Sequence, residues 1–307
     1  MNPSFLCLHG TPITRLICLA LEQMKYMRLN TGALMPMVGL GTYKLPSGEL
    51  LRQALECGYR HIDTSPTYNT EETIGEVITS HINQGLLQRK DLFITTKIPN
   101  NKMSPENVPE SLVRSLSKLQ TDYVDMLLIH MPFGFKGTNE DDLCHYNILE
   151  TWKAMEKLQK NQLTKSIGVS NFTISQLQML IDRSDTTPAN VQLECHVYYQ
   201  VPHLQKFCSE NEIVMSAYSP LGAMNRPKRY FSQDDPILLE DGVIKRIANV
   251  HNKSPAQILL RFLHQQGLIV IPMSDKNIHL EENIAISEFE LTDKDIEDIK
   301  ALDRNFK

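Results

Sequence analysis

From Leu29 onward, short apolar runs alternate with longer amphipathic stretches along the whole chain. The short runs are rich in β-branched residues, and one of them, VDMLLIH, is almost continuously apolar, as expected of a strand buried on both faces. Strands that alternate with helices of this length predict βαβ units and a parallel sheet. Eight strands in succession favour a closed barrel over an open doubly wound sheet. A hairpin that runs into the first strand is predicted over 29–42. The other predicted strands are 61–65, 92–97, 124–130, 166–171, 189–195, 213–219 and 268–274.

The predicted fold is therefore an α/β (β/α)8 TIM barrel with an N-terminal β-hairpin, in which Gly32 forms the turn. Gly58 and Gly85 are expected to end the first two helices, and Ser104-Pro105 to cap the third. The predicted helices are 48–57, 71–82, 106–119, 147–161, 173–183, 201–211, 241–252, 254–267 and 292–303.

Residues 1–26 differ from the rest of the chain and are interpreted as an N-terminal extension, and residues 27–307 as a single barrel domain. The extension contains the apolar stretch LICLALEQM after Arg15, which leaves a weak targeting segment open. A loose extension, or an upstream start codon with Met24 or Met27 as the working start, is favoured.

Composition excludes several functional classes. The formal net charge is −5 with scattered Lys and Arg, which argues against a nucleic-acid partner. No apolar run reaches the length that spans a membrane. The six cysteines show no CxxC and no paired spacing, which is typical of buried or incidental thiols in a reducing, cytoplasmic compartment. No HxH or HExxH cluster suggests a metal site, so a metal-dependent barrel hydrolase is not supported.

Three polar residues, Asp63, Lys97 and His130, close the three successive apolar runs HID, LFITTK and VDMLLIH, and Tyr68 follows Asp63 by five residues. On parallel barrel strands these side chains would share the carboxyl-terminal rim, where such barrels keep their chemistry. A carboxylate, an ammonium, a phenol and an imidazole together predict a proton-donating site. Taken singly, Asp63 could be a cap or turn residue, Lys97 a solvated residue, Tyr68 an amphipathic rim residue and His130 a satisfied core histidine.

The motifs GYRHIDTSPTYNTEETIG, LFITTK, VDMLLIHMP, SIGVSNF, QLECHVY, SAYSPLG and IPMS resemble those of the aldo-keto reductase superfamily, especially its aldose-reductase-type enzymes. The resemblance covers Leu29 to Lys307. It implies that Asp63, Tyr68, Lys97 and His130 form the family's catalytic tetrad. A free phenol has a pKa of about 10 and is a poor donor near neutrality, and Lys97 would lower that pKa. Asp63 would hold Lys97 charged, and His130 would orient the carbonyl oxygen.

No GxGxxG motif follows a strand, so a Rossmann site is not expected. The resemblance instead implies a nicotinamide nucleotide across the barrel's carboxyl-terminal face. The alternatives are that Tyr218 is an ordinary aromatic residue at a strand end, that Gln192 is solvated, and that residues 170–171 only cap the following helix. The implied nicotinamide and pyrophosphate contacts are Ser170, Asn171, Gln192, Tyr218, Ser219 and Leu221. The implied ribose, phosphate and adenine contacts are Thr42, Tyr43, Lys44, Glu282 and Asn283.

The 2′-phosphate site departs from the pattern of NADPH-selective relatives, because Met273 and His279 stand where a Lys and an Arg are usual. Ser274 remains, Lys276 lies close enough to substitute, and Asp275 could accept a ribose 2′-hydroxyl as in NAD sites. NADPH is the expected cofactor, with NADH possible. In the loop after the seventh strand, Asn225 replaces the usual acid that would pair with Lys44, which predicts a looser latch on the cofactor.

Aldose-reductase-type pockets are lined with Trp, whereas this chain has only Trp152, in a predicted helix. The lack of other Trp residues and the short loop 134–147 predict an open and permissive pocket. The expected substrate contacts are Tyr43, Met131 and Phe133, although Met131 and Phe133 could instead be structural packing. The predicted function is NAD(P)H-dependent reduction of small aldehydes and ketones by a monomer, with the hydride from nicotinamide and the proton from Tyr68. Open-chain sugars, dicarbonyls, quinones and prostanoid-like ketones are the candidate substrates. The alternative is a non-catalytic nucleotide-binding barrel that acts as a regulatory or binding subunit.

Overall fold

A computed structural model describes residues 26–135, 142–222 and 235–306. Its main sheet has eight parallel strands in the order β12-β11-β10-β9-β6-β5-β4-β3. The two outer strands meet, because Val38 pairs with Val270 and the Gly41 N–H donates to the Pro272 carbonyl at 3.0 Å. This closure confirms the predicted (β/α)8 barrel. The strands are β3 (Gly39–Gly41), β4 (His61–Asp63), β5 (Phe93–Ile98), β6 (Val124–Ile129), β9 (Thr164–Ser170), β10 (Asn190–Glu194), β11 (Val214–Tyr218) and β12 (Ile269–Val270).

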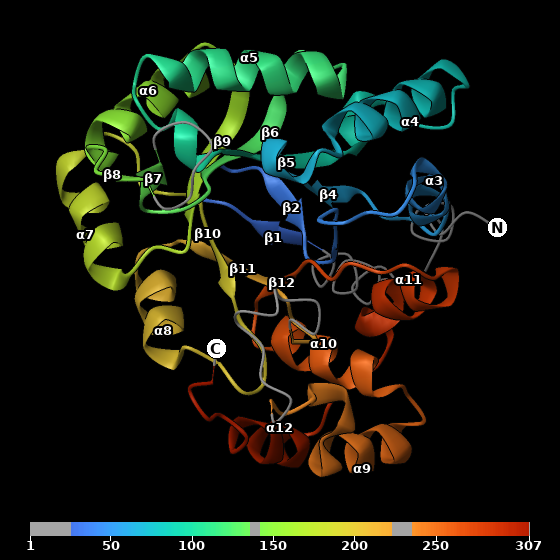
Figure 1. Cartoon of the computed structure of the whole chain (residues 1–307). Helices are drawn as coiled ribbons and strands as arrows, with labels where there is room; N and C mark the ends of the chain where they lie inside the picture. Colours follow the sequence, from blue (N-terminus) through green and yellow to red (C-terminus); the bar gives the residue numbers. More distant parts are fainter. Residues whose placement is uncertain (1–25, 136–141, 223–234, 307) are drawn as a thin grey trace, which may run out of the picture.

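Helices surround the sheet on its outer side (Figure 1). Nine of them correspond to the predicted stretches. A tenth, α11, was not predicted, because only Leu280 and Asn283 of its residues are buried and the amphipathic signal is weak. The helices are α3 (Gly48–Glu56), α4 (Glu71–Asn83), α5 (Asn107–Leu119), α6 (Ile148–Lys160), α7 (Ile174–Arg183), α8 (Pro202–Glu210), α9 (Gly242–His251), α10 (Pro255–Gln265), α11 (Asn277–Ile284) and α12 (Asp293–Lys300).

In the described part of the chain, two short hairpins lie outside the barrel sheet. Strands β1 (Tyr26–Arg28) and β2 (Leu34–Pro36) form the predicted N-terminal hairpin, and Gly32 in its turn has φ +85°. Met35 of this hairpin is fully buried in the same apolar cluster as residues near the amino-terminal ends of several barrel strands. The second hairpin pairs β7 (Gly134–Phe135) with β8 (Leu143–Cys144) and was not predicted.

The helix ends show where local sequence signals decide the structure. Gly58 and Gly85 follow α3 and α4 with φ +101° and +71°, so their predicted role as stops is confirmed. The predicted Ser104 cap is wrong. Helix α5 begins at Asn107, and the backbone carbonyl of Ser104, rather than its hydroxyl, accepts the Asn107 N–H at 2.9 Å. A turn therefore precedes the helix.

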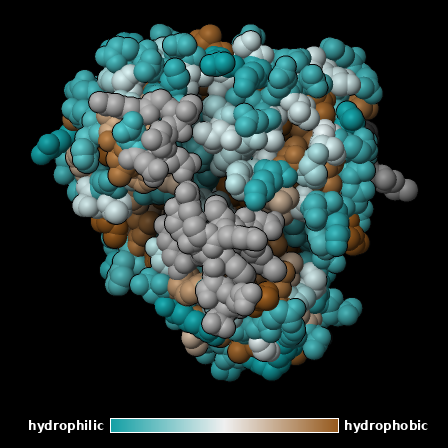
Figure 2. Space-filling view, in the orientation of Figure 1, coloured by the Kyte–Doolittle hydropathy of each residue, from teal (hydrophilic) through white to brown (hydrophobic). Residues whose placement is uncertain are grey.

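Apolar side chains between the barrel and its helices form the main core, which includes Trp152. The face of the molecule seen in Figure 2 is mostly hydrophilic, with apolar residues scattered between. Within the described ranges, no helix has the length and apolar character needed to cross a membrane. Cys57, Cys144, Cys195 and Cys208 are free thiols, and burial raises the pKa of Cys195 and of Cys208 to about 12, which makes both unreactive.

Candidate active site

The carboxyl-terminal ends of three neighbouring strands bring the four predicted catalytic residues together. Asp63 ends β4, Lys97 lies one residue before the end of β5, and His130 directly follows β6. Strand β5 pairs with both of its neighbours, which sets the three side chains on adjacent strands. Tyr68 ends the short 3₁₀ helix η2 (Pro66–Tyr68), which follows β4 almost immediately. The residues therefore share one rim of the barrel, as predicted.

Asp63 and Lys97 form a buried ion pair. The Lys97 Nζ donates to Asp63 Oδ1 at 2.6 Å and to the Thr64 carbonyl at 2.9 Å. Only 1% of Lys97 and 2% of Asp63 is exposed. Burial acts to lower the pKa of Lys97, but Asp63 and Tyr68 outweigh it, and the pKa is raised. Lys97 therefore stays charged, and the alternatives of a solvated lysine and a capping aspartate are wrong.

The second oxygen of Asp63 is held by Gln192 of β10. The Gln192 Nε2 donates to Asp63 Oδ2 at 2.6 Å, and Gln192 is buried. The alternative of a solvated Gln192 is therefore wrong. Since Nε2 is used in this way, Oε1 is the atom of this side chain that would accept an N–H of a nicotinamide amide.

Tyr68 lies between the other members of the cluster. The Lys97 Nζ is 5.1 Å from the centroid of the Tyr68 ring, and the His130 ring is 5.8 Å away at 79°. Burial raises the pKa of Tyr68, whereas the charge of Lys97 acts to lower it. Lys97 therefore acts on this pKa in the expected direction, but the cost of burying a phenolate is larger, and the pKa of Tyr68 is raised overall. Tyr68 therefore keeps its proton at neutral pH.

His130 is a neutral imidazole. Burial, assisted by the charge of Lys97, lowers its pKa to about 3. Its Nδ1 lies 3.2 Å from Ser65 Oγ, and its backbone carbonyl accepts the Asn171 Nδ2 at 3.1 Å. Sequence reasoning missed Ser65, although a serine before Pro66 is a recognisable start of a helical turn.

The residues implied for the nicotinamide end of the cofactor form a connected network beside this cluster. Tyr218 at the end of β11 donates its hydroxyl to Asn171 Oδ1 at 2.8 Å. Asn171 Nδ2 also donates to Ser170 Oγ at 3.0 Å. Thr173, rather than Ser170 or Asn171, caps α7, so the alternative of a simple helix cap is wrong. Amide and hydroxyl groups at three strand ends fit the amide and ring of a nicotinamide.

The residues implied for the ribose and pyrophosphate differ in how far they are exposed to solvent. Thr42 is fully buried, and its hydroxyl donates to the Asp63 carbonyl at 2.8 Å, which directs it into the protein. Tyr43 is half exposed, and the Lys44 Nζ lies 5.4 Å from its ring centroid. Ser219, with φ +48°, begins a turn that contains Leu221. Asn225 lies outside the described residues.

The residues implied for the adenine end lie on the loop before α11 and on α11 itself. Asp275, Lys276 and His279 are exposed, so a 2′-phosphate would meet solvent-exposed side chains rather than a buried Lys–Arg pair. Buried Ser274 accepts the Lys276 N–H at 3.1 Å. Glu282 accepts the Ser254 hydroxyl at 2.9 Å. Met273 is partly buried and Asn283 is buried.

Aromatic side chains stand at the mouth of the site. The Tyr43 ring lies 5.2 Å from the Tyr68 ring, and the Phe133 ring lies 5.8 Å from Phe135. Tyr43 is 50% exposed and Phe133 42%, while Met131 is partly buried. These side chains offer apolar surface for a substrate without enclosing it.

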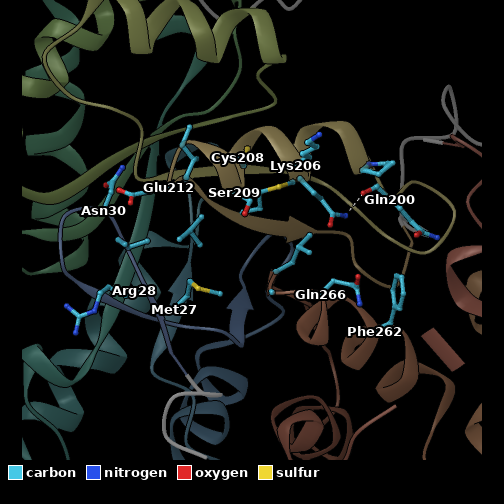
Figure 3. A pocket seen from close by; sticks show the side chains of 18 of the residues that line it. Met27, Arg28, Asn30, Gln200, Lys206, Cys208, Ser209, Glu212, Phe262 and Gln266 are labelled. Carbon is cyan, nitrogen blue, oxygen red and sulfur yellow. Dashed lines mark hydrogen bonds between the residues drawn. The ribbon is translucent and has the colours of Figure 1, made fainter. Parts of the chain in front are cut away.

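A hollow of about 1110 Å³ lies elsewhere on the molecule. Side chains of the N-terminal hairpin, α8 and the end of α10 surround it, among them Met27, Asn30, Gln200 and Gln266 (Figure 3). It contains none of the predicted site residues. The Gln200 amide is engaged with the carbonyls of Val197 and Ile299, so it does not offer its donors to a ligand.

The described ranges hold no group of three or more His, Cys, Asp or Glu side chains that could bind a metal ion.

Comparison with known proteins agrees with this geometry. The family model described as "Aldo/keto reductase family" matches residues 38–304. The chain is 40% identical to human "Aldo-keto reductase family 1 member C3" over 91% of each chain. It is 38% identical to "Aldo-keto reductase family 1 member A1-A" of Danio rerio over 90% of this chain and 89% of the relative. It is 37% identical to "Prostaglandin F synthase 1" of Bos taurus over 92% of each chain.

Proposed function

Because the chain belongs to the aldo/keto reductase family, we propose that it reduces small aldehydes and ketones to alcohols with NAD(P)H and that Tyr68 donates the proton. The observation that carries this proposal is the buried Lys97–Asp63 pair beside a protonated Tyr68 and a neutral His130.

The protonation state of each side chain determines its proposed role in the reaction. A neutral His130 donates a hydrogen bond to the substrate carbonyl oxygen and orients it beside Tyr68. Tyr68 transfers its proton to that oxygen as negative charge develops there. The Lys97 ammonium stabilises the phenolate that remains, and Asp63 holds the ammonium in place. A bound nicotinamide supplies the hydride to the carbonyl carbon.

We propose NADPH as the preferred cofactor, with NADH as a weaker substitute. Ser170, Asn171 and Gln192 would hold the amide of the nicotinamide, and Tyr218 would stack on its ring. Lys276 and His279 would meet the 2′-phosphate. Both are exposed, so the discrimination between the two cofactors should be modest.

The substrate class follows from the open aromatic mouth. Tyr43, Met131 and Phe133 would contact a small aldehyde or ketone. A mouth lined by these half-exposed side chains would admit varied carbonyls, such as open-chain sugars, dicarbonyls, quinones and prostanoid-like ketones. The relative named "Prostaglandin F synthase 1" supports including the last group.

The test is the loss of reduced-nicotinamide absorbance with 4-nitrobenzaldehyde, run in parallel with NADPH and with NADH. The proposal expects turnover with NADPH and slower turnover with NADH. Equal or faster rates with NADH would contradict the cofactor preference. Measurable nucleotide binding without turnover of any carbonyl would favour the alternative, a non-catalytic nucleotide-binding barrel.

A further inference from the structure

Ser65 links two parts of the candidate site, the short helix that ends at Tyr68 and the imidazole ring of His130. Its side chain is fully buried, and its Oγ lies 3.2 Å from His130 Nδ1. The Tyr68 N–H donates to the Ser65 carbonyl at 3.0 Å, which closes the short helix η2. Ser65 therefore contacts His130, the proposed orienting group, through its side chain. Its backbone holds the turn that carries Tyr68, the proposed proton donor.

A neutral imidazole has one N–H and one bare nitrogen, and which nitrogen carries the proton depends on its hydrogen-bond partners. The Thr67 N–H donates to Ser65 Oγ at 3.4 Å, so this oxygen already serves as an acceptor. Thr67 Oγ1, 3.0 Å away and on an exposed residue, can donate to the same oxygen. The Ser65 O–H is then left to donate, and His130 Nδ1 is the acceptor within reach.

We propose that Ser65 is a positioning residue that donates its hydroxyl proton to His130 Nδ1 and so keeps the imidazole proton on Nε2. This inference rests on the proposed carbonyl reduction. Only the Nε2–H tautomer can both accept from Ser65 and donate to a carbonyl oxygen. In the other tautomer a lone pair would face that oxygen, and the orienting hydrogen bond would be lost.

The first measurement is the tautomer of His130 in the wild-type protein, read from the ¹⁵N chemical shifts of its two ring nitrogens. The inference expects a protonated Nε2 and a bare Nδ1. A proton on Nδ1 in the wild type would overturn it, whatever any variant does. This reading does not depend on turnover, so an inactive wild type would refute the proposed function and leave the Ser65 assignment testable.

The second measurement compares Ser65→Ala with Ser65→Thr. Loss of one neutral hydrogen bond costs about 0.5–1.5 kcal/mol, so Ser65→Ala should lower kcat about three- to tenfold and populate both tautomers. Because Ser65 is fully buried and is not among the residues proposed to contact the cofactor, the Kd for NADPH should change less than about twofold. Ser65→Thr keeps the hydroxyl in an extended backbone that β-branched residues accept, and it should restore both readouts.

The matched control is Ser47→Ala. Ser47 Oγ accepts the Leu50 N–H at 3.4 Å at the start of α3, the same distance as the cap that Ser65 makes. Ser47→Ala should lose a comparable amount of stability and leave kcat and the His130 tautomer unchanged. If Ser65→Ala behaves like Ser47→Ala in all three respects, Ser65 is only a cap and the inference fails.

Discussion

Asp63 and Lys97 are almost completely removed from water, and each supplies the counter-charge of the other. Sequence reasoning found both residues, because a charged residue that ends an apolar strand stands out. It gave the direction in which Lys97 acts on the pKa of Tyr68 but not the larger, opposite effect of burial, since burial is a property of the folded chain. It also missed Ser65, whose partner His130 lies 65 residues away.

The buried pair leads to a prediction for Asp63→Asn. Removing the carboxylate leaves the Lys97 ammonium buried without a counter-charge, which should cost about 3–5 kcal/mol of unfolding free energy. Urea titration measures this loss. In the control, Glu49→Gln removes an exposed pair with Arg52, which should cost less than about 1 kcal/mol. Equal losses in the two variants would contradict the account.

His61 leads to a prediction about pH. It is fully buried, and burial lowers its pKa to about 4. In the unfolded chain the His61 imidazole takes up a proton at about pH 6.5, and in the folded chain only at about pH 4. The free energy of unfolding therefore decreases as the pH falls between these values. Between about pH 7 and pH 5 the wild type should lose about 1–2 kcal/mol more than His61→Asn in urea titrations. Parallel pH profiles for the two proteins would show that the buried imidazole is not the cause.

At the scale of secondary-structure elements, the predictions that rested on strong sequence patterns are confirmed. The apolar runs that alternate with amphipathic stretches predicted the barrel strands, and Gly58 and Gly85 predicted the ends of two helices. The errors occurred where local signals were weak or competed. Helix α11 buries too few apolar residues to show a period, and a backbone turn at Ser104 replaced the expected side-chain cap.

Helices α4 and α5 pack so closely that only glycine fits at Gly75. A Cβ there would collide with the Lys118 carbonyl oxygen and would lie 2.8 Å from the Leu119 carbonyl carbon. Because backbone atoms cannot move aside cheaply, Gly75→Ala should lower the free energy of unfolding by about 1–3 kcal/mol. Thermal or urea unfolding measures this change.

The control for Gly75→Ala is Gly242→Ala at the start of α9, where a Cβ would meet nothing within 4 Å. This variant should be unchanged or more stable by up to about 1 kcal/mol. A Gly75→Ala protein as stable as Gly242→Ala would mean that the two helices are not in such close contact.

At the scale of the whole molecule, barrel closure brings together residues that the sequence separates widely. Gln192 and Asp63 are 129 positions apart and share a hydrogen bond. The resemblance implied a role for each residue, but their contact depends on the geometry of the closed sheet and could not be predicted from either motif alone.

The nucleotide site leads to a prediction for Met273→Lys. A charge-assisted hydrogen bond is worth about 1.5–3 kcal/mol, so a Lys at this position should tighten NADPH binding about ten- to a hundredfold. The Kd for NADH should change less than about twofold, because NADH lacks the 2′-phosphate. Ile278→Lys adds the same charge at an exposed position nearby and controls for long-range attraction. A similar gain for both nucleotides, or for both variants, would contradict the placement of the 2′-phosphate beside Met273.

The central claim is that the Tyr68 hydroxyl donates the proton, and Tyr68→Phe removes that hydroxyl alone. The most direct measurement is kcat for 4-nitrobenzaldehyde together with the Kd for NADPH, with Tyr123→Phe as a control far from the rim. The account predicts that Tyr68→Phe binds NADPH normally and loses at least about 10²-fold in kcat, while Tyr123→Phe matches the wild type. Near-normal turnover by Tyr68→Phe would contradict it.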